Sequence, residues 1–151
     1  MKFFTKQETI AVFIILLVIS IISFFNFKTS LRRGRDNERE NDLGDIGKLL
    51  DDYKEKNSIY PTSLNDLKNS PKDPSTPQGY SYLYLTDGKF YQLYASLEGG
   101  TDENQYMPNV AALGLKCGQF ICNFGRASSN TPLDKTLQEY ENELKAKDVK
   151  K

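Results

Sequence analysis

Side chains that could perform catalysis form no recognised pattern in this sequence. The 151-residue chain contains no histidine, which removes the commonest general base and the commonest imidazole metal ligand. Its serines fit no Gly-x-Ser-x-Gly turn, and its glycines fit no phosphate-binding or dinucleotide-binding motif. Acidic residues are plentiful, but no pair has a spacing that indicates acid–base catalysis. We therefore expect that the protein is not an enzyme.

The two cysteines, Cys117 and Cys122, are the next candidates for chemistry. Without histidine they cannot complete a tetrahedral zinc site of the usual kind. A local disulfide is favoured if this part of the chain lies outside the cytoplasm, and a pair of buried free thiols is the alternative. Such a bond would close a small ring and stabilise the fold only modestly.

Hard oxygen donors gather in the segment 98–104. Glu98, Asp102 and Asn104 carry oxygens of the kind that calcium prefers. Their spacing fits no calcium-loop motif, and an ordinary solvated turn explains the same composition. Calcium is the one cofactor that the sequence indicates, with these three residues as its candidate ligands.

The charge balance argues against nucleic acid as a partner. Lysine and arginine total 20, and aspartate and glutamate total 20, so the formal net charge is zero. Proteins that bind nucleic acid through its phosphates usually carry a basic surface. We expect no nucleic-acid partner.

A long apolar stretch near the N-terminus predicts a transmembrane helix. No charged residue occurs from Thr9 to Phe27, and 19 helical residues span roughly 28 Å, close to the hydrocarbon thickness of a bilayer. A cleaved secretory signal is the alternative, but the stretch exceeds a usual signal core and no small-x-small cleavage site follows. Glu8 stands directly before the stretch. It is either solvated at the membrane edge, where it favours the helix dipole, or paired with a positive charge.

The sequence after the apolar stretch predicts a continuing helix that packs on a β-hairpin. In the segment 31–57 one helical face is apolar and carries Leu43, Ile46, Leu50 and Tyr53. Alternating tyrosines at 80, 82 and 84 and a second run at 90–97 flank an Asp-Gly turn, which is a strong hairpin signal. We expect one face of this hairpin to cover the apolar face of the helix.

The remaining segments predict a short capped helical turn, further residues of the hydrophobic core and a C-terminal helix. Ser63 is expected to cap one turn of helix. Apolar residues between 110 and 126 should add core. They are Ala112, Leu113, Leu115, Phe120, Ile121 and Phe124. Thr131 and Pro132 are expected to start a peripheral helix that ends in a frayed tail.

The N-terminus resembles that of type IV pilins and type II secretion pseudopilins. Phe4 and Glu8 are four residues apart and precede the long apolar helix, as in that family, although Phe3 stands where the family has glycine. Tyr60-Pro61 after the helix and the tyrosine-rich hairpin are similar too. The resemblance implies that a prepilin peptidase cuts between Phe3 and Phe4, and that Glu8 pairs with the new N-terminal amine of a neighbouring subunit.

Together, these observations and the resemblance predict an α+β, pilin-like fold. Residues 1–3 form a short leader, 4–30 a transmembrane helix, 31–57 its amphipathic continuation, 58–130 a small antiparallel β domain and 131–151 a C-terminal helix and tail. Basic residues after the apolar stretch favour a cytoplasmic C-terminal domain by the positive-inside rule. The resemblance instead implies a single-pass protein of the cytoplasmic membrane with its N-terminus inside and its domain outside, and we follow it.

The resemblance also implies a function. The chain would be a structural subunit of a type IV pilus-like or pseudopilus filament. Its partners would be the membrane, copies of itself or other pilin-like subunits, the prepilin peptidase and the assembly machinery. The alternative is a single-span membrane anchor that displays an extracytoplasmic binding domain and has no filament role.

Overall fold

The computed structural model describes residues 5–99 and 106–148, and its first element is the long helix α1 (Lys6–Asn57). The chain divides into two compact units, residues 1–34 and residues 35–151, and α1 contributes to both. The helix begins with Thr5 as its cap and ends just before Ser58, whose positive φ of 66° is incompatible with a further helical turn.

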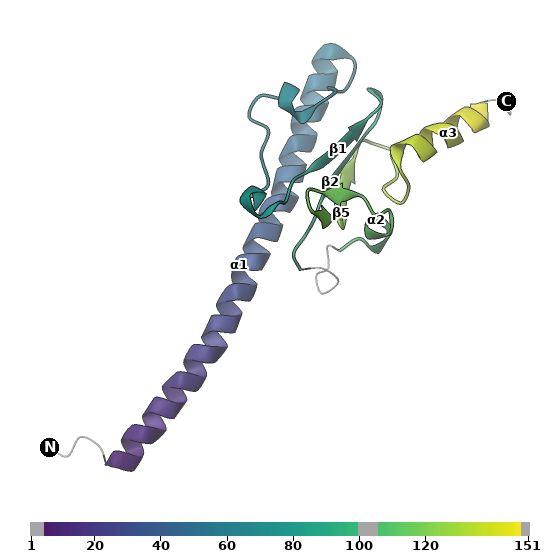
Figure 1. Cartoon of the computed structure of the whole chain (residues 1–151). Coiled ribbons are helices and arrows are strands. Elements are labelled where there is room, and N and C mark those ends of the chain that lie inside the picture. The colour runs from purple at the N-terminus through teal and green to yellow at the C-terminus, as the bar shows by residue number, and fades with distance from the viewer. Residues whose placement is uncertain (1–4, 100–105, 149–151) are drawn as a thin grey trace. The chain divides into compact units, whose positions relative to one another are not determined.

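The second unit combines the C-terminal part of α1 with small strands and short helices (Figure 1). In chain order these elements are η1 (Leu64–Asp66), η2 (Thr76–Gln78), β1 (Leu83–Thr86), β2 (Tyr91–Ala95), α2 (Pro108–Ala112), β3 (Lys116–Cys117), β4 (Phe120–Ile121), β5 (Phe124–Ala127) and α3 (Leu137–Asp148). The expected α+β class, with a long N-terminal helix, a small antiparallel sheet and a C-terminal helix, is confirmed.

The main sheet has three antiparallel strands in the order β1-β2-β5. Its first hairpin is the predicted one, and Leu83 pairs with Tyr94 while Thr86 pairs with Tyr91. The Asp87 carboxylate closes the turn by accepting hydrogen bonds from the backbone N–H groups of Lys89 and Phe90. This Asx-type contact explains why the Asp-Gly signal identified the turn correctly.

The sheet packs on α1 as expected. Leu43, Ile46 and Leu50 of α1 are fully buried in one cluster with the core-facing side chains of β2. Those side chains alternate along the strand, as the pleat requires, and are Tyr91, Leu93 and Ala95. The hairpin therefore covers the apolar face of the helix, and Tyr53 packs at the edge of the same cluster.

A smaller cluster lies on the other face of β2, and here part of the prediction is wrong. Tyr94 is fully buried with Val110 and the two cysteines. Phe120 and Ile121 were expected in the core, but they are 37% and 47% exposed. The cysteines take the buried positions of the β3–β4 hairpin, which leaves its tip on the surface. Ala112, at the end of α2, is exposed as well.

The C-terminal helix starts later than predicted, at Leu137 instead of Pro132. The Gln92 side-chain amide donates to the carbonyls of Pro132 and Lys135 at 2.7 and 2.9 Å, which holds this segment out of helical geometry. Thr136, and not Thr131, caps α3 through reciprocal hydrogen bonds with Glu139. By contrast, the capped turn at Ser63 is confirmed as the 3₁₀ helix η1, with Asp66 completing the cap.

Candidate functional site

The N-terminal half of α1 is apolar on all sides and uncovered. Every large apolar side chain from Ile10 to Phe27 is between 44% and 69% exposed. Among the described residues, α1 is the one helix long and apolar enough to cross a membrane. A helix that is hydrophobic all round requires an apolar environment, which lipid or other apolar helices provide. This surface is the first candidate functional feature.

Glu8 forms a local hydrogen-bond pair at the start of that helix. Its carboxylate accepts a hydrogen bond from the backbone N–H of Thr5 at 2.7 Å, and its own backbone N–H lies 3.4 Å from the Thr5 hydroxyl. This reciprocal arrangement is a capping box, which satisfies two of the free N–H groups at a helix start. The Glu8 side chain is otherwise exposed. Phe3 and Phe4, the predicted cleavage residues, lie outside the described residues.

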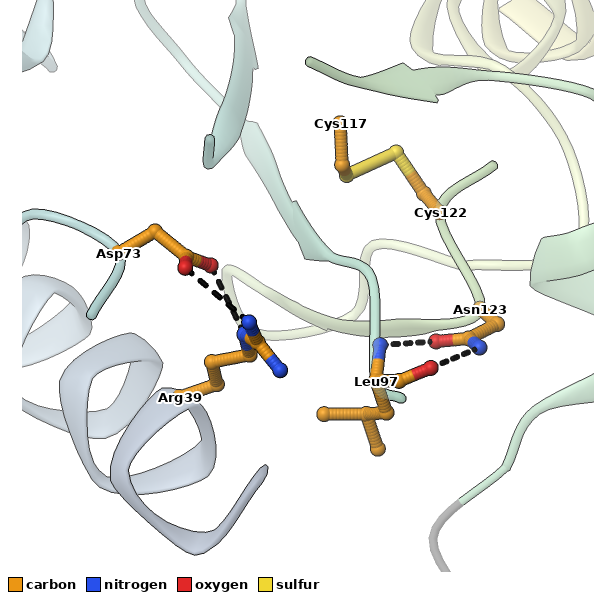
Figure 2. Close-up of a disulfide and its surroundings, with 6 residues drawn as sticks. All are labelled: Arg39, Asp73, Leu97, Cys117, Cys122 and Asn123. Carbon is orange, nitrogen blue, oxygen red and sulfur yellow. Dashed lines mark hydrogen bonds and ion pairs between the residues drawn. A yellow bond between two sulfur atoms is a disulfide. The ribbon is translucent and has the colours of Figure 1, made fainter. Parts of the chain in front are cut away.

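The second unit contains a buried ionic cluster centred on Arg39, which sequence reasoning missed. Arg39 is fully buried, and Figure 2 shows it in a two-point contact with Asp73. Its Nε and Nη2 atoms donate to the two Asp73 oxygens at 2.9 and 3.2 Å. Its Nη1 atom donates to Asp36 at 2.7 Å and lies 3.0 Å from Glu98. One guanidinium group thus contacts three carboxylates.

The same carboxylates bind backbone groups of two loops. Asp36 accepts hydrogen bonds from the N–H groups of Glu98 and Gly99, both at 2.8 Å. Asp73 accepts one from the N–H of Ser75 at 2.7 Å. Hydrogen bonds from a backbone N–H to an ionised carboxylate are stronger than neutral ones. The cluster therefore fixes the loops at 73–75 and 98–99 to α1.

The charges of the cluster stabilise one another. Hydrogen bonds from Arg35 lower the pKa of the Glu98 carboxyl below its usual range, and those from Arg39 add to this effect. Burial by itself would lower the pKa of Arg39, but its hydrogen bonds to Asp73, Asp36 and Glu98 outweigh that effect and raise it. Buried charges of this kind are stable only when paired and hydrogen-bonded.

Aromatic rings and the disulfide hairpin lie next to this cluster. The Arg39 guanidinium lies 4.4 Å from the centre of the Tyr80 ring, which in turn stacks on Phe120 with centres 3.9 Å apart. Gly118 of the hairpin pairs with Tyr80 and has a φ of +76°, and a Cβ atom there would lie 2.0 Å from the carbonyl oxygen of Gly79. Only glycine permits this close approach.

Cys117 and Cys122 are joined by a disulfide bond whose Cα atoms are 5.2 Å apart (Figure 2). The residue after Cys122, Asn123, binds Leu97, two residues beyond the end of β2, through its side-chain amide. It accepts a hydrogen bond from the N–H of Leu97 at 2.7 Å and donates one to the Leu97 carbonyl at 2.9 Å. The hairpin and the segment after β2 are thereby held together.

The predicted calcium ligands are only partly described. Both Glu98 carboxylate oxygens accept hydrogen bonds or ion-pair contacts from Arg35 and Arg39. Asp102 and Asn104 lie outside the described residues. In the described residues, no group of three or more cysteine, aspartate or glutamate side chains has a spacing that could hold a metal ion. Calcium binding at residues 98–104 stays a prediction.

Comparisons with known proteins do not assign the chain to a family. No family model, no curated protein and no solved structure matches it. What the structure establishes is the architecture, a long N-terminal helix followed by a small antiparallel sheet. That architecture is compatible with a pilin-like fold.

Proposed function

We propose that the chain is a structural subunit of a pilin-like filament, either a type IV pilus or a type II secretion pseudopilus. One observation carries the proposal, namely the contrast in burial along α1. Leu43, Ile46 and Leu50 are fully covered by the sheet, whereas the apolar residues from Ile10 to Phe27 are uncovered on all sides. A helix with these two parts suits a subunit whose domain folds around one part and whose other part enters an apolar assembly.

The proposed mechanism is assembly and involves no chemical step after processing. The apolar half of α1 holds the subunit in the cytoplasmic membrane until the assembly machinery removes it. It then packs against the helices of neighbouring subunits, an environment as apolar as lipid. A prepilin peptidase removes residues 1–3 beforehand, as the resemblance at Phe4 and Glu8 implies.

The proposed orientation places the domain outside the cytoplasm. The disulfide between Cys117 and Cys122 supports this orientation, because disulfides persist in oxidising compartments and are rare in the cytoplasm. The basic residues that follow the apolar segment favour the opposite orientation. We give the disulfide more weight than these basic residues, because the disulfide is part of the folded domain whose location is in question.

Two roles of Glu8 compete, and they can be separated experimentally. As part of a capping box, Glu8 needs only a hydrogen-bond acceptor that reaches the Thr5 N–H, and glutamine serves at this position as well as glutamate. As a register residue, it needs a negative charge to pair with the N-terminal amine of a neighbour, because an unpaired charge in an apolar assembly is costly. The capping role alone would favour the alternative function, a single-span anchor for a binding domain.

The experiment compares Glu8→Gln and Glu8→Ala with Glu55→Gln, an exposed carboxylate further along the same helix. Each full-length variant is expressed in cells that contain the prepilin peptidase and the assembly machinery. We expect both Glu8 variants to insert into the membrane normally and to form no filaments, while Glu55→Gln forms them normally. Filament yield is measured by shearing and electron microscopy, and insertion by membrane fractionation. Normal filaments from Glu8→Gln would reject the register role.

A further inference from the structure

The Arg39 cluster joins three segments that are far apart in the sequence. Asp36 and Arg39 lie one turn apart on α1, Asp73 lies 34 residues beyond Arg39, and Glu98 follows β2. The cluster uses a single buried cation, with Arg35 as a second, half-exposed partner of Glu98. No part of the proposed filament function requires this arrangement, so its role can be argued separately.

Two of the three carboxylates that contact Arg39 also bind the backbone of the loops. Asp36 binds the backbone of Glu98 and Gly99, and Asp73 binds the backbone of Ser75. Without a cation between them, the buried carboxylates of Asp36 and Asp73 and the partly buried one of Glu98 would repel one another and draw in water. Loss of the guanidinium would therefore release both loops together, and not merely one ion pair.

The geometry of the cluster fits a guanidinium and not a metal ion. The planar Arg39 fork meets Asp73 through two nitrogens and meets Asp36 and Glu98 through the third. This fork geometry matches carboxylates that approach from several sides in one plane. The spacing of carboxylates in the described residues suits no metal ion. The Tyr80 ring, 4.4 Å away, adds a cation–π contact that a buried guanidinium favours.

We propose that the guanidinium of Arg39, a cation that is covalently part of the chain, holds the loops at 73–75 and 98–99 to α1. It takes the structural role that a dissociable metal ion would otherwise have. The attachment of these loops is consequently independent of divalent cations. This proposal holds whether or not the subunit forms filaments.

The first test uses the unmodified full-length protein in detergent micelles. Its melting temperature, followed by circular dichroism, should be the same with a chelator and with millimolar calcium. Hydrogen exchange at the Glu98 and Gly99 amides should also be the same in both conditions, because Asp36 protects them without a metal. A rise in melting temperature or in protection with calcium would overturn the proposal and would favour the predicted calcium site at residues 98–104.

The second test removes the cation. Arg39→Ala should lower the melting temperature by roughly 10 °C or more, because it leaves buried carboxylates unpaired. Exchange at the Glu98 and Gly99 amides should accelerate at least about tenfold. Arg39→Lys keeps the charge but offers one point of contact, so it should recover only part of both losses. The control is Lys48→Ala, which removes an exposed ion pair with Asp45 and should change neither quantity.

A chemical complementation separates a guanidinium site from a general loss of packing. Methylguanidinium at millimolar concentration should raise the melting temperature of Arg39→Ala and restore amide protection. It should affect neither the unmodified protein nor a double variant that also carries Asp73→Asn, because that change removes half of the two-point partner. Amide exchange that is unchanged in Arg39→Ala, or complementation that is equal in the double variant, would refute the proposal.

Discussion

At the scale of single residues, the ionic groups of the folded domain are the best-defined features of this protein. Arg39 is fully buried, while Asp36 and Asp73 are almost so, and all three are paired. Sequence analysis singled out Glu98 for its oxygens, as a candidate calcium ligand or as part of an ordinary turn, and calcium binding stays a prediction. The structure gives those oxygens to Arg35 and Arg39. Their partners could not be identified from the sequence, because ion pairs between distant residues leave no local pattern.

The charge of Glu98 predicts how stability depends on pH. Hydrogen bonds from Arg35 hold its pKa below the ordinary value of 4.5, so the folded state favours the ionised carboxylate. Stability from this group is therefore fully present above about pH 4.5 and is lost as the pH falls from there through the folded-state pKa. We expect the melting temperature of the full-length protein to fall over this interval, as measured by circular dichroism.

The variant Glu98→Gln tests whether Glu98 is the group responsible for this pH dependence of stability. It should be less stable than the unmodified protein at pH 7 and should lose less stability between pH 5 and pH 3. Glu55→Gln, which changes an exposed side chain, serves as the control and should follow the unmodified protein. An equal slope for Glu98→Gln and the unmodified protein would show that other carboxylates account for the pH dependence.

At the scale of elements, local patterns predicted most helices and strands but not all of their ends. The Asp87-Gly88 hairpin and the apolar face of α1 were correct because each depends on residues close in sequence. The start of α3 was wrong because Gln92, a strand residue, binds the carbonyls of Pro132 and Lys135. The Thr136-x-x-Glu139 capping signature was present in the sequence and would have located the start correctly.

The contact between β2 and β5 yields a prediction about Gly125. A Cβ atom at Gly125 would lie 2.8 Å from the Tyr94 ring and 3.1 Å from the Leu93 carbonyl oxygen. Tyr94 is fully buried beside the disulfide and has little room to move. Gly125→Ala should therefore lower the free energy of unfolding by about 1–3 kcal/mol, as overpacking of a core does. Urea unfolding of the full-length protein in micelles measures the change.

Gly34→Ala is the matched control for this glycine substitution. Gly34 lies inside α1, and within the described residues no atom other than those of its chain neighbours and its own helix backbone lies within 4 Å of a Cβ placed there. Alanine is the better helix former by about 1 kcal/mol, so this variant should be as stable as the unmodified protein or more stable. Equal destabilisation by the two substitutions would mean that Gly125 is not constrained by Tyr94.

At the scale of the whole molecule, the apolar half of α1 is long and apolar enough to cross a membrane, and this predicts where the protein resides. Its uncovered surface is too large and too apolar for a helix in water. We expect the full-length chain to sediment with membranes and to resist extraction with alkaline carbonate. A variant that lacks residues 1–34 keeps the second compact unit and should appear in the soluble fraction.

Mass spectrometry of the membrane-bound protein completes this prediction. A mature N-terminus at Phe4 would support processing by a prepilin peptidase, and a retained Met1 would leave an unprocessed anchor. An N-terminus after the apolar segment, together with recovery in the soluble fraction, would mean that the segment is a cleaved signal and would refute the membrane prediction.

The sequence by itself determined the apolar N-terminal helix, its amphipathic continuation and the hairpin that covers it. These features follow from periodicity and turn residues, which act over a few positions and here agree with the tertiary packing. Only the tertiary structure decided that Arg39 fastens two loops, that Phe120 and Ile121 are exposed, and that α3 begins at Leu137. Each of these depends on which residues far apart in the chain are brought together, as Arg39 and Asp73 are, 34 positions apart. Such pairings are selected by the packing of the whole domain and by the need to satisfy its buried polar groups.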